Sequence, residues 1–283
     1  MKIGVHTSIA GSIVNAVHHA KKIGCDTFQI FSANPRSWKR QELDSLQCKK
    51  FCSERSSAKI SPLAIHCNYL INLASHEPVN RDKSIVAFRQ EIQRAKMLKA
   101  DYLIVHPGSA RGGVTESAIQ LCADSMKRAV GSLNLDFLTI LVENTAGQGC
   151  SIGRSFEEVA EILSLANELP LGVCLDTAHC FEAGYPIHTK KGLDQTMQRA
   201  ARTFGIKRLL AVHANDSKTA LGSHSDRHEH IGNGQIGLAA FRRIVNHPYL
   251  INLPFICETP IDRPGDDKRN LRTLRKLSTN HGF

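Results

Sequence analysis

The segment "LGVCLDTAHCFEAGY", residues 171–185, ends an apolar run on an acidic residue. Its first five residues are apolar or small, a composition typical of a parallel strand that is covered on both faces. Asp176 follows directly, and His179 comes three residues later. A carboxylate is costly to bury unless it is paired or bound to a metal. The segment therefore predicts a buried strand whose C-terminal end carries metal ligands, and the same pattern recurs along the chain.

Eight apolar runs alternate with helical patterns. Residues 83–99 and 237–245 carry apolar stripes at three- and four-residue spacing, and Ser155 with Glu158 predicts a capping box at the start of 155–163. This alternation predicts the α/β class and a (β/α)8 TIM barrel, as one domain over residues 1–283. The runs lie at 2–6, 27–31, 62–66, 102–106, 138–143, 171–176, 208–213 and 254–258.

Composition restricts the location of the protein. The 283 residues are 42% hydrophobic, enough for a large core, and no apolar run approaches the roughly 18 residues of a membrane span. The start, "MKIGVH", leads straight into a strand without the features of a secretory signal. The nine cysteines form no CxxC pair, so we interpret them as free thiols of a reducing compartment. We expect a cytoplasmic monomer with no membrane partner.

The chain is strongly basic, with a formal net charge of +10 and a pI near 9.3. A basic surface attracts polyanions and is typical of proteins that bind nucleic acids. Many basic proteins bind no nucleic acid, and here the charge is spread along the chain. Charge therefore favours a nucleic-acid partner without deciding it.

Six of the eight runs end on a potential metal ligand: His66, His106, Glu143, Asp176, His213 and Glu258. All strands of a parallel barrel end on the same face, so these side chains are predicted to converge there. His179 follows Asp176 in a loop on that face. Asp226 and His228 are two residues apart, so both side chains point the same way in an extended chain. His230 would point that way too and is the alternative to His228 as a metal ligand. His6 also ends a strand, and we interpret it as a neighbour of the ligands or a structural residue.

The predicted set contains five histidines and four carboxylates, which suit Zn²⁺, with Mn²⁺ or iron as alternatives. With three to four protein ligands per ion and one bridging carboxylate, nine ligands fit three ions. Three Zn²⁺ carry +6 and four carboxylates −4, which leaves +2. A cationic cluster of this kind holds a phosphate and stabilises negative charge that develops during its reaction.

Seven blocks of the sequence closely resemble the endonuclease IV family of apurinic/apyrimidinic endonucleases. The resemblance implies a trinuclear zinc TIM barrel that cleaves double-stranded DNA 5′ of an abasic site, leaving a 3′-hydroxyl and a 5′-deoxyribose phosphate. It also implies removal of blocking groups from 3′ ends. The blocks are "HCNYLINLA" (66–74), "HPGS" (106–109), "ENTAGQG" (143–149), "DTAHCFEAGY" (176–185), "HANDSK" (213–218), "DRHEHIGNG" (226–234) and "ETP" (258–260).

The resemblance also implies a role for each residue. The ligand sets would be His66, His106 and Glu143 for one zinc, Glu143, Asp176, His213 and Glu258 for a second, and His179, Asp226 and His228 for a third. Glu143 would bridge, and Glu258 would help to orient the hydroxide that attacks phosphorus, which makes both catalytic. Residues 32–40, with Arg36, resemble a DNA-penetrating loop. Tyr69 and Leu70 resemble residues that fill the helix at the lesion, or else they are ordinary packing residues.

Two other functions compete with this hypothesis. Metal-dependent sugar isomerases and epimerases use similar barrels with carboxylate and histidine ligands, but they need neither a third metal nor a wedge beside His66. A non-catalytic DNA-binding barrel would explain the charge and leave the nine ligands without a purpose. Incision of DNA that carries one abasic site discriminates between the three.

Overall fold

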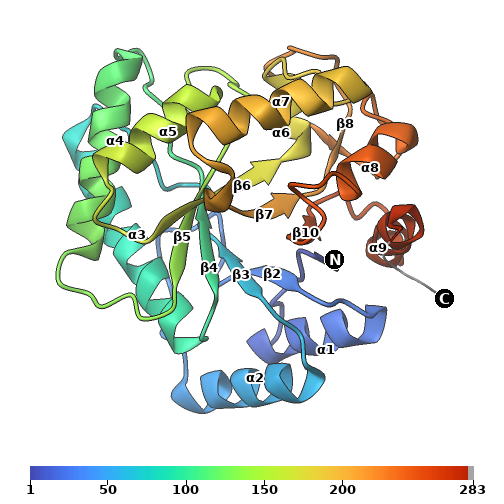
Figure 1. The fold of residues 1–283 in the computed structure, drawn as a ribbon. Coiled ribbons are helices and arrows are strands. Elements are labelled where there is room, and N and C mark those ends of the chain that lie inside the picture. The colour runs from blue at the N-terminus through green and yellow to red at the C-terminus, as the bar shows by residue number, and fades with distance from the viewer. Residues whose placement is uncertain (280–283) are drawn as a thin grey trace.

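A computed structural model describes residues 1–279 as a nearly closed barrel of eight parallel strands surrounded by helices (Figure 1). The predicted fold is confirmed, and each of the eight apolar runs contains one strand. The predicted domain 1–283 includes residues 280–283, which lie outside the described residues. The barrel strands are β1 (Lys2–Val5), β2 (Phe28–Phe31), β3 (Leu63–His66), β4 (Tyr102–Val105), β5 (Thr139–Glu143), β6 (Leu171–Asp176), β7 (Leu209–His213) and β10 (Pro254–Cys257).

Hydrogen bonding runs around the barrel in the order β1-β10-β7-β6-β5-β4-β3-β2, with every neighbouring pair parallel. The remaining gap, between β1 and β2, is crossed by a single parallel bridge between His6 and Gln29. The backbone N–H of Thr7 donates to the carbonyl of Gln29 there, at 2.7 Å. Gln29 is therefore held at the seam where the barrel closes.

Helices cover the outside of the barrel, with α1 and α2 side by side below it in Figure 1. The capping box is only half formed: Ser155 accepts from the N–H of Glu158 at 3.2 Å, whereas the Glu158 carboxylate accepts from the N–H of Gly153 at 2.6 Å. The helices are α1 (Ile13–Ile23), α2 (Ser45–Ala58), α3 (Pro78–Met97), α4 (Thr115–Val130), α5 (Phe156–Leu165), α6 (Thr177–Glu182), α7 (Lys190–Thr203), α8 (Leu238–Val245) and α9 (Asp266–Leu277).

The inside of the barrel contains its own apolar layer, separate from the larger core between strands and helices. Each member of this layer precedes a predicted metal ligand by two residues. Because side chains alternate between the faces of a strand, residues two apart point the same way. The six strand-end ligands therefore point toward the barrel axis, directly above the apolar layer. The layer consists of Ala64, Ile104, Leu141, Cys174, Ala211 and Ile256.

Two short strands, β8 (Asp216–Ser217) and β9 (His228–Glu229), form an antiparallel pair on the same rim. The buried Asp216 carboxylate accepts hydrogen bonds from the backbone N–H groups of Gly232, Gly234 and Ile236 at 2.9–3.1 Å, which fixes the loop after β9. All nine cysteines are free thiols, as predicted. Across residues 1–279, none of the helices combines the length and the apolar character that crossing a membrane requires.

Candidate metal centre

Glu143, at the end of β5, lies at the centre of the site and is fully buried. Its Oε2 lies 3.2 Å from Nε2 of both His66 and His106. Its Oε1 lies 2.8 Å from Nδ1 of His213 and 3.4 Å from Nδ1 of His179. The two oxygens of one carboxylate thus face different histidines, which is the arrangement a carboxylate needs to bridge two ions.

The sequence after β6 places the next ligands. Asp176 is the N-cap of α6, and its Oδ1 accepts a hydrogen bond from the backbone N–H of His179 at 2.8 Å. An aspartate is a favoured N-cap because its carboxylate satisfies N–H groups that have no partner within the helix. The cap fixes His179 on the first turn of α6, with its ring above Asp176. One local motif therefore positions two of the nine residues.

The hairpin of β8 and β9 contributes Asp226 and His228. Oδ1 of Asp226 lies 3.3 Å from Nε2 of His179 and 3.5 Å from Nε2 of His228. The N–H of Asp226 donates to the side chain of Gln148 at 2.9 Å, and the N–H of Arg227 donates to Glu182 at 3.2 Å. The ends of this segment are thus anchored to the barrel, and both side chains face inward as the two-residue spacing predicts.

At this rim the potential ligand atoms gather into three neighbouring groups, in each of which all atoms lie within 4.8 Å of one another; a separate cluster of His230, Asp262 and Asp266 meets the same criterion and shares no residue with them. Two of the groups coincide with the sets implied by the resemblance. The third differs, because it joins His179 and His228 to Asp176, while Asp226 lies beside it. The groups are His66, His106 and Glu143; Glu143, Asp176, His213 and Glu258; and Asp176, His179 and His228.

Hydrogen bonds of the histidine rings fit metal ligation. Nδ1 of His66, His179 and His228 donates to the backbone oxygens of Cys67, Asn144 and Glu258, at 2.7, 2.9 and 3.2 Å. When the ring is neutral, as a metal ligand must be, this leaves Nε2 with a lone pair that points at the carboxylates. Nε2 of His179 and of His228 is buried and has no hydrogen-bond partner among the described residues, although Asp226 is near both. A ring nitrogen fixed by a carbonyl, with the other nitrogen free, is the usual state of a metal-binding histidine.

The charges of the site call for cations. Burial raises the pKa of the Glu143 carboxyl, but His213 and His106 outweigh it and hold that pKa well below its usual range. Burial likewise lowers the pKa of His213, and the nearby groups, Cys174 and Glu143 foremost, raise it well above its usual value. The carboxylates thus draw positive charge from the neighbouring imidazoles. Divalent ions would supply that charge and leave the imidazoles neutral.

Two amides at the site have no counterpart in the sequence-based prediction. The buried Gln29 accepts from Nε2 of His213 through Oε1 at 2.9 Å and donates from Nε2 to Glu258 at 2.5 Å. This contact leaves Nδ1 of His213 free to face Glu143. Asn215 donates to Oδ2 of Asp176 at 2.6 Å and accepts from the N–H of Glu258 at 2.8 Å. Gln29 in β2 and Asn215 just after β7 both occupy inward-facing positions, and this alternation in the sequence could have identified the two amides.

His6 contacts the same group, with Nδ1 3.0 Å from Nε2 of Gln29 and 3.6 Å from Oε1 of Glu258. Its position beside the ligands, outside the three groups, agrees with its interpretation as a neighbour. His230, the competitor of His228, lies elsewhere. Asn270 donates to Nδ1 of His230 at 3.0 Å, so Nε2 carries the proton that faces Asp262 at 3.4 Å. The structure thus brings His228, and not His230, to the ligand groups.

Residues predicted to contact DNA lie beside the metal groups. A pocket of 320 Å³ is lined by Tyr69 together with His66, His106 and Glu258. The ring centroid of Tyr69 lies 6.2 Å from that of His66, and its side chain is exposed. An adjoining hollow is lined by Tyr69, Leu70 and the exposed Trp38, which the sequence-based prediction overlooked although it is the only tryptophan.

Arg36 is exposed on the 32–40 loop, which is tied to the Tyr69 segment at two points. The N–H of Tyr69 donates to the carbonyl of Pro35 at 3.1 Å, and Asn68 donates to the carbonyl of Ser37 at 2.8 Å. The structure therefore brings all three predicted DNA contacts to one edge of the metal pocket.

Comparisons with known proteins agree with this geometry. Residues 17–277 match the family of xylose isomerase-like TIM barrels. A probable endonuclease 4 from Solibacter usitatus is 50% identical over 281 residues, which cover 98% of this chain and 97% of the relative. The crystal structure of endonuclease IV from Thermus thermophilus superposes with a TM-score of 0.86 at 35% identity, covering 98% of both chains.

A D-psicose 3-epimerase from Clostridium cellulolyticum, 14% identical, superposes with a TM-score of 0.66 over 100% of this chain and 93% of that one, and shows the shared fold alone. The endonuclease relatives have much higher identity to this chain than the epimerase, over nearly the whole chain, so they identify the family. The chain belongs to the endonuclease IV family.

Proposed function

We propose that this protein is a zinc-dependent DNA-repair endonuclease that hydrolyses the phosphodiester 5′ of abasic sites in double-stranded DNA. The products would be a 3′-hydroxyl and a 5′-deoxyribose phosphate, and the same centre would remove blocking groups from 3′ ends. The observation that carries the proposal is the placement of Glu143, whose two oxygens face different sets of histidines. A single-ion site has no need of such a bridge.

The three ligand groups would hold three Zn²⁺, with Mn²⁺ as an alternative at one or more positions. Ions held there would lower the pKa of water toward neutrality and neutralise the negative charge that builds up on the phosphate. The groups of this chain then act on the nucleophile and the substrate. Glu258 is held by Gln29 through Oε1 while Oε2 remains near His213 at 3.2 Å, so we assign it to orient the attacking water.

The edge of the pocket formed by the 32–40 loop and the Tyr69 segment would recognise the lesion. An abasic nucleotide has no base to unstack, so it costs less to extrude than any other nucleotide. Tyr69 and Leu70 would fill the vacated space in the duplex, and the Arg36 guanidinium would contact it from the 32–40 loop. The exposure of Tyr69 beside the metal groups supports this assignment, because a packing residue would be covered. We further propose that the protein acts as a cytoplasmic monomer.

The test is incision of a duplex oligonucleotide that carries one abasic site. We expect cleavage 5′ to the lesion, a 3′-hydroxyl product that a polymerase extends, loss of activity on chelation and recovery with Zn²⁺. Elemental analysis of protein purified without chelator is expected to give three ions per chain. Binding without incision would indicate a DNA-binding barrel, and turnover of a free ketose would indicate a sugar epimerase.

A further inference from the structure

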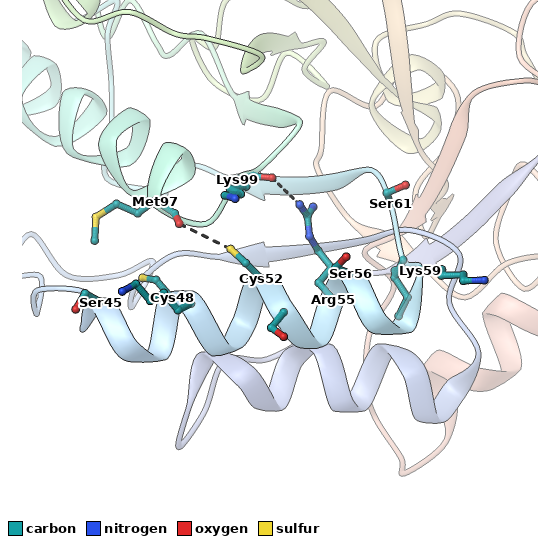
Figure 2. A pocket seen from close by; sticks show the side chains of 12 residues that line it. Ser45, Cys48, Cys52, Arg55, Ser56, Lys59, Ser61, Met97 and Lys99 are labelled. Atoms are coloured by element: carbon teal, nitrogen blue, oxygen red, sulfur yellow. Dashed lines mark hydrogen bonds between the residues drawn. The ribbon is translucent and has the colours of Figure 1, made fainter.

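A second cavity of 860 Å³ lies on the outer wall of the barrel, between α2 and the end of α3 (Figure 2). It exceeds the metal pocket in volume and shares no residue with it. Ile60 and Ser61 precede β3 and Lys99 precedes β4, so the groove reaches the barrel end where strands begin, away from the metal groups. Its lining consists of Ser45, Cys48, Lys49, Cys52, Ser53, Arg55, Ser56, Lys59, Ile60, Ser61, Met97 and Lys99.

The lining is cationic, with three lysines, one arginine and no acidic residue. Arg55 is held in place, because it donates to the Lys99 carbonyl at 2.7 Å and pairs with Asp101 at 3.2 Å. Within residues 1–279, no carboxylate oxygen lies within 4.0 Å of the ammonium groups of Lys49, Lys59 or Lys99. Three uncompensated charges around one groove favour an anionic occupant.

Two of these lysines have strained backbones. Lys59 has φ 55° and ψ 35° at the end of α2, and Lys99 has φ 50° after α3. The left-handed region at a helix end is normally occupied by glycine or asparagine, because a longer side chain raises the conformational energy there. At Lys59 this conformation ends α2, and the N–H of Lys59 donates to the carbonyls of Arg55 and Ser56. Both lysines line the groove, at separate points of its rim (Figure 2).

The floor between the cations is apolar. Cys48, Cys52, Ile60 and Met97 form it, and Cys52 reaches the carbonyl of Met97 at 3.9 Å. Burial raises the pKa of both thiols, so both are neutral at physiological pH. A cationic rim over an apolar floor suits a molecule with an anionic end and a flat apolar part.

We propose that this groove binds a small phosphorylated molecule of the nucleoside monophosphate class, with its phosphate among the cationic side chains of the rim and its base on the apolar floor. The volume lies within the range of about 300–1,000 Å³ typical of small-molecule sites. The site is independent of the proposed nuclease centre.

The test is calorimetric titration of the metal-loaded full-length protein with 2′-deoxyadenosine 5′-monophosphate (dAMP). The decisive variant is Lys59→Asn with Lys99→Asn, because asparagine tolerates the left-handed backbone and removes the charge. We expect dAMP affinity to fall about 10-fold or more, because the variant removes two of the four cationic side chains of the lining. Lys50→Asn is the matched control, since Lys50 is an exposed lysine of the same helix outside the lining. It should bind dAMP like the original protein.

Two further readouts complete the experiment. The double variant is expected to unfold at the same temperature or higher and to incise abasic DNA normally, which separates this site from the nuclease centre. Deoxyadenosine and inorganic phosphate should each bind more weakly than dAMP. Unchanged dAMP affinity in the double variant would overturn the proposal, as would phosphate binding as tightly as dAMP. Loss of undamaged-duplex affinity in that variant, without any dAMP binding, would mark the groove as a DNA surface instead.

Discussion

Replacing Gln29 by leucine tests whether an amide sets the metal-binding state of His213. Gln29 is fully buried at the barrel seam, and its Oε1 receives the proton on Nε2 of His213 at 2.9 Å. This contact keeps the lone pair on Nδ1, the atom that lies 2.8 Å from Glu143 and 3.2 Å from Glu258. Leucine has a similar size but cannot accept that proton, so the histidine loses the bond that fixes its tautomer.

The expected loss of metal affinity follows from the two contacts of Gln29, with His213 and with Glu258. Removing a partner that orients a metal ligand lowers metal affinity about 10- to 100-fold, or roughly 1.4 to 2.8 kcal/mol. The variant also removes the 2.5 Å hydrogen bond to Glu258, whose side chain is 17% exposed and keeps its contact with His213 at 3.2 Å, so this second loss adds less. We therefore expect one of the three proposed ions to dissociate at 10- to 100-fold lower chelator concentration than in the original protein.

The assay is a chelator titration followed by elemental analysis, which needs no measurement of activity. Thr27→Val is the matched control: Thr27 is buried just before β2 and donates to the Pro62 carbonyl at 2.6 Å, away from the ligands. It should lose stability without losing metal. Gln29→Glu retains the acceptor for His213 but not the donor to Glu258, so it separates the two contacts. A Gln29→Leu titration that superimposes on that of the original protein would refute the reasoning.

Three further predictions concern the metal groups and the DNA edge. Glu143→Ala should lose metal and incision together, and three ions retained by elemental analysis would contradict the bridging role. Arg36→Ala should weaken binding to abasic DNA about 10-fold with its metal content intact, measured by fluorescence anisotropy; loss of zinc would place Arg36 in the metal centre instead. In metal-free protein, the neighbouring groups raise the pKa values of His179 and His213 well above 6.5. The protonated rings therefore stabilise the folded protein fully below pH 6.5. This stabilisation is lost as the pH rises through the pKa values of the folded state. The stabilisation by Zn²⁺, measured as the difference in Tm between loaded and chelated protein, should therefore grow above pH 6.5, and a constant difference would count against this account.

The sequence alone determined the barrel and the placement of the six potential ligands at the strand ends. Each strand is a short apolar run, and its last inward-facing position is polar, so the two-residue alternation of a strand already assigns these side chains to one face. Ala64 before His66, and Cys174 before Asp176, show this most simply. Both members of each pair point to the same face because they are two residues apart in one strand, which depends on that strand alone.

The tertiary structure decided what depends on contacts between strands. Gln29 meets His213 and Glu258 only because β1 and β2 close the barrel beside β10, a register that no local pattern encodes. The choice of His228 over His230 has the same origin: both have the same phase, and the bonds of Asn270 and Asp262 hold His230 away. The groove likewise depends on how α2 packs beside the end of α3, which are distant in the sequence. Local periodicity fixes the direction of a side chain, whereas its partners depend on how distant segments pack.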